Sequence, residues 1–297
     1  MKRNYLKSLF TALLLLCCTV ATAHDFAVDG IYYNILSQED KTVEVTYLGE
    51  SYSSYSGEYR YDVTIPANVT YNSTSYSVTT IGEGAFHSCY SLTSITIPNG
   101  VTTIGEYAFY DCGDLINITI PNSVTTIGNG AFSGCICLNF TIPNSVTTIG
   151  DYAFQGCCLN LTSITIPNSV TTIGEYVFAD CSSLTSIEIS NSVTTIGDGT
   201  FSGCSSLKSI EIPNSVTTIG DRAFYKCSSL SSITVGNNVT TIGEYVFADC
   251  SSLTSIEIPN GVTTIGDRAF YSCSSLSSIT IPNSVTTIGE YVFYNCI

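Results

Sequence analysis

Cysteine is the residue type whose number and spacing most clearly suggest chemistry, because thiols can form disulfides or bind zinc. Ten of the 14 cysteines recur about every 23 residues, at Cys89, Cys112, Cys135, Cys157, Cys181, Cys204, Cys227, Cys250, Cys273 and Cys296. Zinc sites cluster their ligands as Cys-x-x-Cys pairs, and cysteines stacked one above another have parallel Cβ vectors that suit a disulfide poorly. We therefore predict a buried ladder of reduced thiols acting as small hydrophobes, with no metal and no other cofactor.

The regular spacing breaks at one place. The unit after Cys135 is one residue short and the following unit is one residue long, so the two irregularities compensate in length. They bring two additional cysteines to the same part of the chain. If any disulfide forms, the candidates are Cys135, Cys137, Cys157 and Cys158.

A column of acidic residues follows the recurring Ile-Gly pairs. Its members are Glu83, Glu106, Asp151, Glu175, Asp198, Asp221, Glu244, Asp267 and Glu290, with Asn129 interrupting the row. Carboxylates in this number could bind Ca²⁺, but ligands on one line do not enclose an ion. We favour the alternative that each acid is the N-cap of a short helical turn.

Residues for catalysis are scarce. The chain has two histidines, His24 and His87, which makes a Ser-His-Asp set implausible despite the many serines. Glu188 and Glu211 could in principle act as a glycosidase pair, but the chain has no tryptophan to line a sugar-binding cleft. We predict that the protein is not an enzyme.

These columns belong to one repeated unit of about 23 residues. Ile-Gly recurs ten times between Ile81 and Ile288, with Phe five residues after each Ile. Ile-x-Ile-Pro predicts a short strand that the proline ends, Asn-Ser or Asn-Gly predicts a turn, and Val-Thr-Thr-Ile predicts a second extended piece. Glu/Asp-x-Ala-Phe-x-x-Cys predicts one helical turn at the corner. One unit cannot bury its own apolar side, so the units must stack.

The motif Leu-x-x-Ile-x-Ile-Pro, followed by Val-x-x-Ile-Gly-x-x-Ala-Phe-x-x-Cys, resembles the BspA-type leucine-rich repeat. The resemblance covers residues 63–297. It implies a right-handed leucine-rich-repeat solenoid of about ten coils, β-rich, with short parallel strands. It also implies a bacterial surface protein that works in adhesion or binding. Residues 24–62 are similar to the N-terminal segment of exported Bacteroidetes members of this family.

Residues 1–23 have the pattern of a secretory signal peptide. Lys2, Arg3 and Lys7 precede an apolar run, and small residues end at Ala23, where we expect cleavage. A lipoprotein signal, with Cys17 or Cys18 lipidated, is a weaker alternative. Removing three basic residues leaves 24 acids against 6 bases, a net charge of −18, which disfavours nucleic acid or anionic lipid as a partner. We expect a secreted or outer-surface protein without a membrane span.

Both ends of the solenoid raise the question of capping. Residues 26–36 and 42–48 alternate as strands around residues 37–40, so we predict a β-hairpin that caps the first coil within residues 24–62. The sequence stops inside a repeat at Cys296-Ile297. We expect a truncated solenoid there, with end-to-end self-association as the alternative.

The outward positions of the Ile-x-Ile strands form the predicted binding face. They are Thr96, Thr119, Thr141, Thr165, Glu188, Glu211, Thr234, Glu257 and Thr280, with Lys208 at the flank. A flat Thr/Ser/Glu sheet can dock an extended area of a host or microbial surface protein or glycan. The alternative is a purely structural or self-associating surface-layer solenoid.

Two further columns are secondary candidates. Tyrosines and arginines share one corner position, at Tyr107, Tyr152, Tyr176, Arg222, Tyr245, Arg268 and Tyr291, and could either bind a partner or cover the apolar column. Thr102-Thr103 and its copies form a regular array of the kind found in ice-binding proteins. Thr also has a high β-propensity and suits a half-buried strand, so ice binding is the less favoured interpretation.

Overall fold

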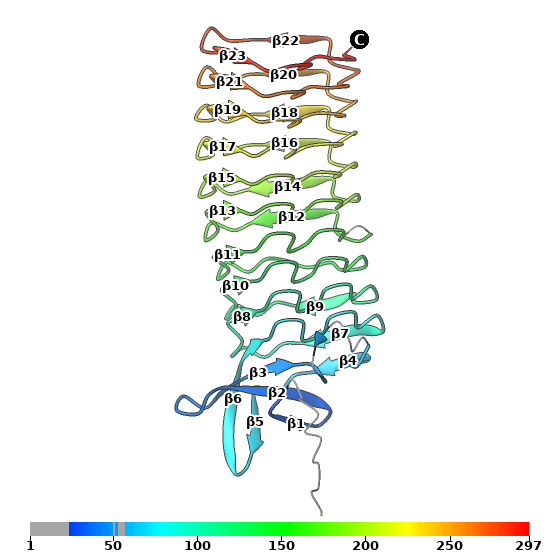
Figure 1. Ribbon diagram of the computed structural model, residues 1–297, viewed down its shortest axis with the longest axis vertical. Helices are drawn as coiled ribbons and strands as arrows, with labels where there is room; N and C mark the ends of the chain where they lie inside the picture. Colours follow the sequence, from blue (N-terminus) through cyan, green and yellow to red (C-terminus); the bar gives the residue numbers. More distant parts are fainter. Residues whose placement is uncertain (1–23, 50, 53–56, 158, 297) are drawn as a thin grey trace, which may run out of the picture.

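In the computed structural model, which describes residues 24–296 except 50, 53–56 and 158, the chain forms a tall stack of parallel coils above an N-terminal β region (Figure 1). The repeats make a parallel β-solenoid of about 9 turns, which confirms the predicted leucine-rich-repeat class. Two series of short strands follow the stack, called here the first and second ladders, and each is divided into separate hydrogen-bonded sheets.

The first ladder consists of the Thr-Ile pairs before each Ile-Gly corner. Equivalent residues pair in register, as Thr195↔Thr218 and Ile196↔Ile219 do. Thus each unit lies directly above the preceding one. Its strands are β6 (Thr74–Ile81), β8 (Thr103–Ile104), β10 (Thr126–Ile127), β11 (Thr148–Ile149), β13 (Thr172–Ile173), β15 (Thr195–Ile196), β17 (Thr218–Ile219), β19 (Thr241–Ile242), β21 (Thr264–Ile265) and β23 (Thr287–Ile288).

The second ladder consists of the strands of the predicted binding face. Their burial alternates, because Ile187 and Ile189 of β14 point into the core while Ser186 and Glu188 point outward. The strands are β4 (Tyr61–Thr64), β7 (Leu92–Thr96), β9 (Asn117–Thr119), β12 (Ser163–Ile166), β14 (Ser186–Ile189), β16 (Ser209–Glu211), β18 (Ser232–Thr234), β20 (Ser255–Glu257) and β22 (Ser278–Thr280). At the irregular unit the ladder is reduced to an isolated bridge between Asn117 and Asn139.

The N-terminal region is an antiparallel sheet that joins the first ladder. β2 (Ile31–Ser37) pairs with β1 (Phe26–Val28) and with β3 (Thr42–Thr46), and β3 then pairs in parallel with β6. The expected single strand over 26–36 is divided at Asp29 and Gly30, which both have positive φ. β5 (Asn68–Tyr71) pairs antiparallel with the start of β6. The role of the N-terminal region as a cap stays a prediction, as does the domain boundary at residue 62. Residues 1–23 lie outside the described residues.

The corners contradict the predicted helical turns. No helix occurs among the described residues, and each corner is a series of turns. In one coil Tyr176 and Asp180 have φ of 52° and 58°, a left-handed conformation that a right-handed helix cannot contain. The N–H groups of Tyr176, Phe178 and Asp180 donate to carbonyl oxygens of the next coil, at 2.7–2.9 Å. The corner hydrogen bonds therefore run between coils rather than along a helix.

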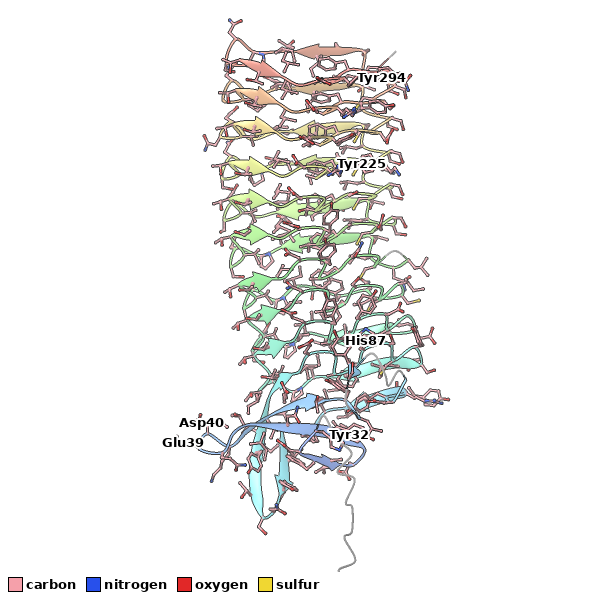
Figure 2. The ribbon with its side chains drawn as sticks, viewed as in Figure 1. Tyr32, Glu39, Asp40, His87, Tyr225 and Tyr294 are labelled. Atoms are coloured by element: carbon pink, nitrogen blue, oxygen red, sulfur yellow. The ribbon has the colours of Figure 1, made fainter. Side chains whose placement is uncertain are left out.

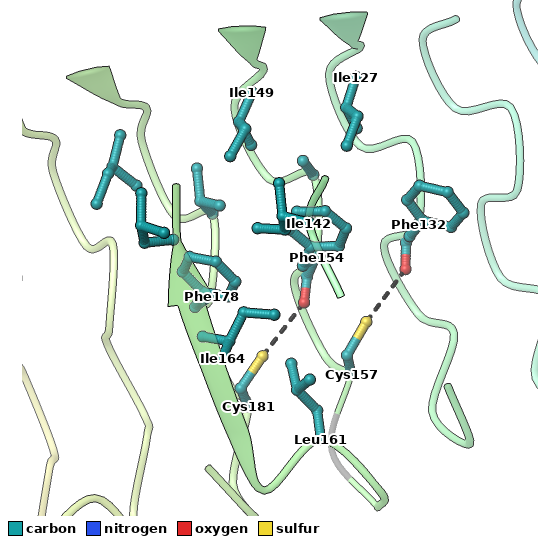
Figure 3. Packing of buried hydrophobic residues seen from close by; sticks show 14 of the residues in the cluster. Ile127, Phe132, Ile142, Ile149, Phe154, Cys157, Leu161, Ile164, Phe178 and Cys181 are labelled. Atoms are coloured by element: carbon teal, nitrogen blue, oxygen red, sulfur yellow. Dashed lines mark hydrogen bonds between the residues drawn. The ribbon is translucent and has the colours of Figure 1, made fainter. Parts of the chain in front are cut away.

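The core is a column of aromatic rings surrounded by aliphatic side chains. The phenylalanine of each coil stacks on its neighbours, with ring centroids 5.0 Å apart for Phe86 and Phe109 and 5.9 Å for Phe178 and Phe201. Figure 3 shows this packing around Phe132, Phe154 and Phe178. Leu, Ile and Val of each unit fill the remaining space, so burial comes from contacts between coils.

Candidate binding face

The cysteine column lies in the core, where each thiol serves a neighbouring coil. The Sγ of Cys204 and that of Cys227 donate to the carbonyl oxygens of Phe178 and Phe201, each at 3.1 Å. Figure 3 shows the same contacts from Cys157 to Phe132 and from Cys181 to Phe154. Sequence reasoning missed this role: the column requires a small apolar side chain that also satisfies a buried carbonyl group.

The described cysteines are thiols, including Cys135, Cys137 and Cys157 at the irregular unit. Cys158 lies outside the described residues, so the disulfide candidates stay a prediction. Within residues 24–296, apart from those not described, no group of three or more His, Cys, Asp or Glu side chains is arranged to hold a metal ion.

Because the thiols are buried, the stability of the fold decreases at alkaline pH. Desolvation raises the pKa of Cys89 and that of Cys273 from 9.0 to about 12. Above pH 9 the unfolded chain releases these protons while the folded chain keeps them, so the stabilisation is complete below pH 9 and is lost as pH rises toward 12.

We expect the urea midpoint to be flat near neutral pH and to fall above pH 9, the ordinary thiol pKa. Cys273→Ala should reduce the slope of unfolding free energy against pH by up to about 1.4 kcal/mol per unit. The matched control is a surface Ser275→Ala change, which should leave the slope as it is. Equal slopes in the parent and Cys273→Ala proteins would contradict a titrating buried column.

The aspartates of the acidic column bind the next coil instead of capping helices. Asp198 Oδ1 accepts the backbone N–H of Asp221 at 2.9 Å, and Asp221 Oδ1 accepts that of Glu244 at 2.7 Å. Asn129, which interrupts the row of acids, makes the same bond to Asp151 N at 2.9 Å. The predicted N-cap role is therefore wrong, because there is no helix to cap. A short Asx side chain at this corner instead binds the backbone of the next coil.

All nine predicted binding-face residues are exposed, eight of them in strands of the second ladder and Thr141 in the irregular unit, where no strand forms. Thr96 lies beside Thr119, Glu211 beside Thr234, and Glu257 beside Thr280, in each case in register. Lys208 is exposed just before β16, and Thr64 of β4 extends the column by one position that sequence reasoning missed. The result is a row of exposed hydroxyl and carboxylate groups along the stack, over strands that pair in four separate sheets.

Shallow hollows lie beside this row. One, of about 390 Å³, is lined by Glu211, Asn214, Thr234, Asn237 and Glu257 together with neighbouring backbone. Others lie beside Glu257, Asn260 and Thr280, and beside Thr141, Asn144 and Thr165. The asparagine after each Ile-Pro strand therefore belongs to the face, and its constant position in the repeat was the signal that could have revealed it.

The Tyr/Arg column stacks on itself. The rings of Tyr152 and Tyr176 are parallel at 5.1 Å, and the guanidinium group of Arg268 lies 5.5 Å and 5.0 Å from the rings of Tyr245 and Tyr291. Where a coil has glycine at this position, the preceding ring covers it: a Cβ added to Gly130 would lie 2.7 Å from the Tyr107 ring. The faces of these groups are thus in use within the molecule, and their edges face solvent.

The second Thr array also bonds internally. Thr217 Oγ1 and Thr286 Oγ1 each donate to a threonine carbonyl of the preceding coil at 3.3 Å.

Nδ1 of His87 lies 3.0 Å from Ser88 Oγ, but Ser88 is only 6% exposed and the two residues are adjacent in the chain. Burial lowers the pKa of His87, and a hydroxyl so enclosed is poorly placed to attack a substrate.

The in-register coils, the buried phenylalanine column and the exposed strand face together define a leucine-rich-repeat solenoid, a class that typically serves as a binding scaffold. The chain belongs to the BspA-type leucine-rich repeat family, whose model matches residues 66–185 and 171–297 in 6 copies. The predicted family is therefore confirmed.

Solved structures of similar chains include a leucine-rich repeat protein from Bacteroides ovatus ATCC 8483. It is 32% identical, with a TM-score of 0.58 over 92% of this chain and 93% of that chain. A leucine rich cell surface protein from Faecalibacterium prausnitzii A2-165 is 31% identical, with a TM-score of 0.46 over 91% of this chain and 92% of that one. No curated protein matches the chain.

Within the described part of the chain, no helix has the length and apolar character needed to cross a membrane.

Proposed function

We propose that this protein is an exported, non-catalytic binding protein that docks a surface protein or glycan on its strand face. The observation that carries the proposal is the row of exposed side chains on β7, β9, β12, β14, β16, β18, β20 and β22, which strand pairing holds in register in successive groups of two or three coils. Membership of a repeat family typical of binding scaffolds supports it. So does the signal-peptide pattern of residues 1–23, with the resulting outer-surface or secreted location.

Rigidity is what the scaffold contributes to binding. Eight of the nine outward side chains project from a strand that is paired with at least one neighbouring coil, so little backbone entropy is lost when a partner docks. A repeated face also allows several weak contacts to act together on one extended or repetitive partner. The competing proposal is a purely structural solenoid that associates only with itself.

A retention assay separates the two proposals. Soluble residues 24–297 are passed over immobilised extracellular-matrix and bacterial-surface fractions, and retention is compared among single-residue variants. Thr165→Arg and Thr234→Arg place a bulky cation in the middle of the exposed row, so each should weaken retention by about tenfold or more if the face is the contact surface.

The matched control is Thr217→Arg, which makes the same change at the residue just before β17 of the other ladder. Circular dichroism should show that all three variants are folded. Equal retention of parent, face variants and control would remove the strand face from the proposal. Absence of any retention, combined with concentration-dependent self-association, would favour the structural alternative.

A further inference from the structure

The strand face changes its chemistry along the stack. Its outward positions are threonine from Thr64 to Thr165, and then include three carboxylates, at Glu188, Glu211 and Glu257. Glu188 accepts a long hydrogen bond of 3.4 Å from Thr165 Oγ1, whereas the described residues provide no hydrogen-bond or ion-pair partner for Glu211 or Glu257. These two carboxylates are exposed in a chain of strong negative charge, so their field attracts a cationic partner.

A departure from the repeat lies beside the hollow between these carboxylates. Gly236 replaces the proline that ends the other strands of the face except at Ser190. A Cβ at Gly236 would overlap the carbonyl group of Pro213, so the glycine lets the chain lie against the coil below. The hollow beside it has a volume of about 390 Å³, with buried Ile212 and Val235 in its floor.

Asparagines form the opposite rim of the hollow. The Asn214 side-chain oxygen accepts the backbone N–H of Asn237 at 2.8 Å, which fixes the amide and leaves its Nδ2 group as a donor. Asn237 and Asn260 occupy the same place in the next two coils and are also exposed. The hollow therefore offers carboxylates on one side and amide groups on the other.

The spacing of the carboxylates selects the shape of the partner. Glu211 and Glu257 are two coils apart, about 9.6 Å at the usual strand separation. A polyproline II helix has three residues per turn and rises about 9.3 Å in each turn, so two side chains three residues apart would meet the two carboxylates. In an extended β-strand, same-side residues recur at about 6.7 Å, which does not match. Backbone groups of a polyproline II segment are also open to hydrogen bonds, which the asparagine amides can donate.

We propose that the hollow between Glu211 and Glu257 docks a polypeptide in the polyproline II conformation with Lys or Arg at every third residue, aligned along the solenoid axis. The inference rests on the proposed function, since it names the partner chemistry of the same strand face. Recognition is by side chains on the face, which strand pairing between β16 and β18 and between β20 and β22 holds in place.

The test measures fluorescence anisotropy of labelled peptides with soluble residues 24–297. The probe is a Pro-Pro-Lys repeat, and the comparison peptides are a Pro-Pro-Glu repeat and a peptide with the same number of lysines at every second residue in a Thr-Lys repeat. We expect the Pro-Pro-Lys repeat to bind most tightly, and its affinity to fall as salt increases. Tighter or equal binding of the Thr-Lys repeat would overturn the pitch match.

The carboxylates are tested with Glu211→Gln and Glu257→Gln, each expected to weaken binding of the Pro-Pro-Lys repeat by about two- to fivefold, and together by about tenfold. The matched control is Glu39→Gln, the same change of charge on the exposed turn of the N-terminal region (Figure 2). An equal loss in Glu39→Gln would show a general charge effect and overturn the site.

Failure of this inference is distinguishable from failure of the proposed function. If no peptide binds while Thr165→Arg still abolishes retention on a surface fraction, the face binds a partner of other chemistry and the peptide proposal falls alone. If Thr165→Arg has no effect on retention and no peptide binds, both fall.

Discussion

Phe201→Ala should lower the free energy of unfolding by about 3–5 kcal/mol, because it removes a fully buried ring and leaves a cavity. The ring lies between those of Phe178 and Phe224, with centroid distances of 5.9 and 5.4 Å, and its exposure is 0%. Coils on both sides lose contacts at once, and a rigid backbone ladder limits how far they can close the gap. Urea denaturation followed by circular dichroism measures the loss.

Tyr90→Ala is the control for this prediction, since it removes an aromatic side chain that is 51% exposed. We expect that change to cost under about 1 kcal/mol. Similar losses for the two variants would mean that the ring column does not carry the stability of the stack. A split unfolding transition for Phe201→Ala would instead show that the two halves of the solenoid unfold separately.

Gly197→Ala should destabilise the protein by about 3 kcal/mol, because the added methyl group cannot fit between two coils. The new Cβ would lie 2.7 Å from the carbonyl carbon and oxygen of Gly174 and 2.9 Å from Glu175 N. All three are backbone atoms, so no side chain can move aside. The coils must separate locally, which weakens the hydrogen bonds of the corner.

Gly113→Ala is the matched control, because nothing lies within 4 Å of a Cβ at that position. We expect its unfolding free energy to stay within about 0.5 kcal/mol of the parent value. Equal stability of the Gly197 and Gly113 variants would show that the coils are not held at the close separation seen in the structure.

The period of the repeat predicts a large part of this structure. Residues at equal positions must lie above one another, so the burial of Phe201 and Cys204 and the exposure of Glu211 follow from their place in the unit. Which carbonyl group a thiol meets does not follow, since the contact from Cys204 to Phe178 joins residues that are 26 apart.

The corners could not be predicted from local pattern alone. Ala-Phe-x-x-Cys has helical spacing, but the N–H groups there bond to the next coil, a long-range arrangement that propensity does not capture. The glycines at 130 and 134, both with positive φ, were the local signal against a helix. Likewise the missing proline at Gly236 was visible in the sequence, whereas the hollow beside it depends on the path of the neighbouring coils.

Site-specific photo-crosslinking tests the central claim, that the strand face is the surface that binds. A benzophenone side chain is placed in separate variants at Thr165 on the face, at Tyr176 in the corner column and at Thr217 just before β17 of the other ladder. Each variant is irradiated with a retaining surface fraction. Crosslinks from Thr165 alone, or far above those from the other two, are the predicted result. Crosslinks that form mainly from Tyr176 or Thr217 would contradict the account.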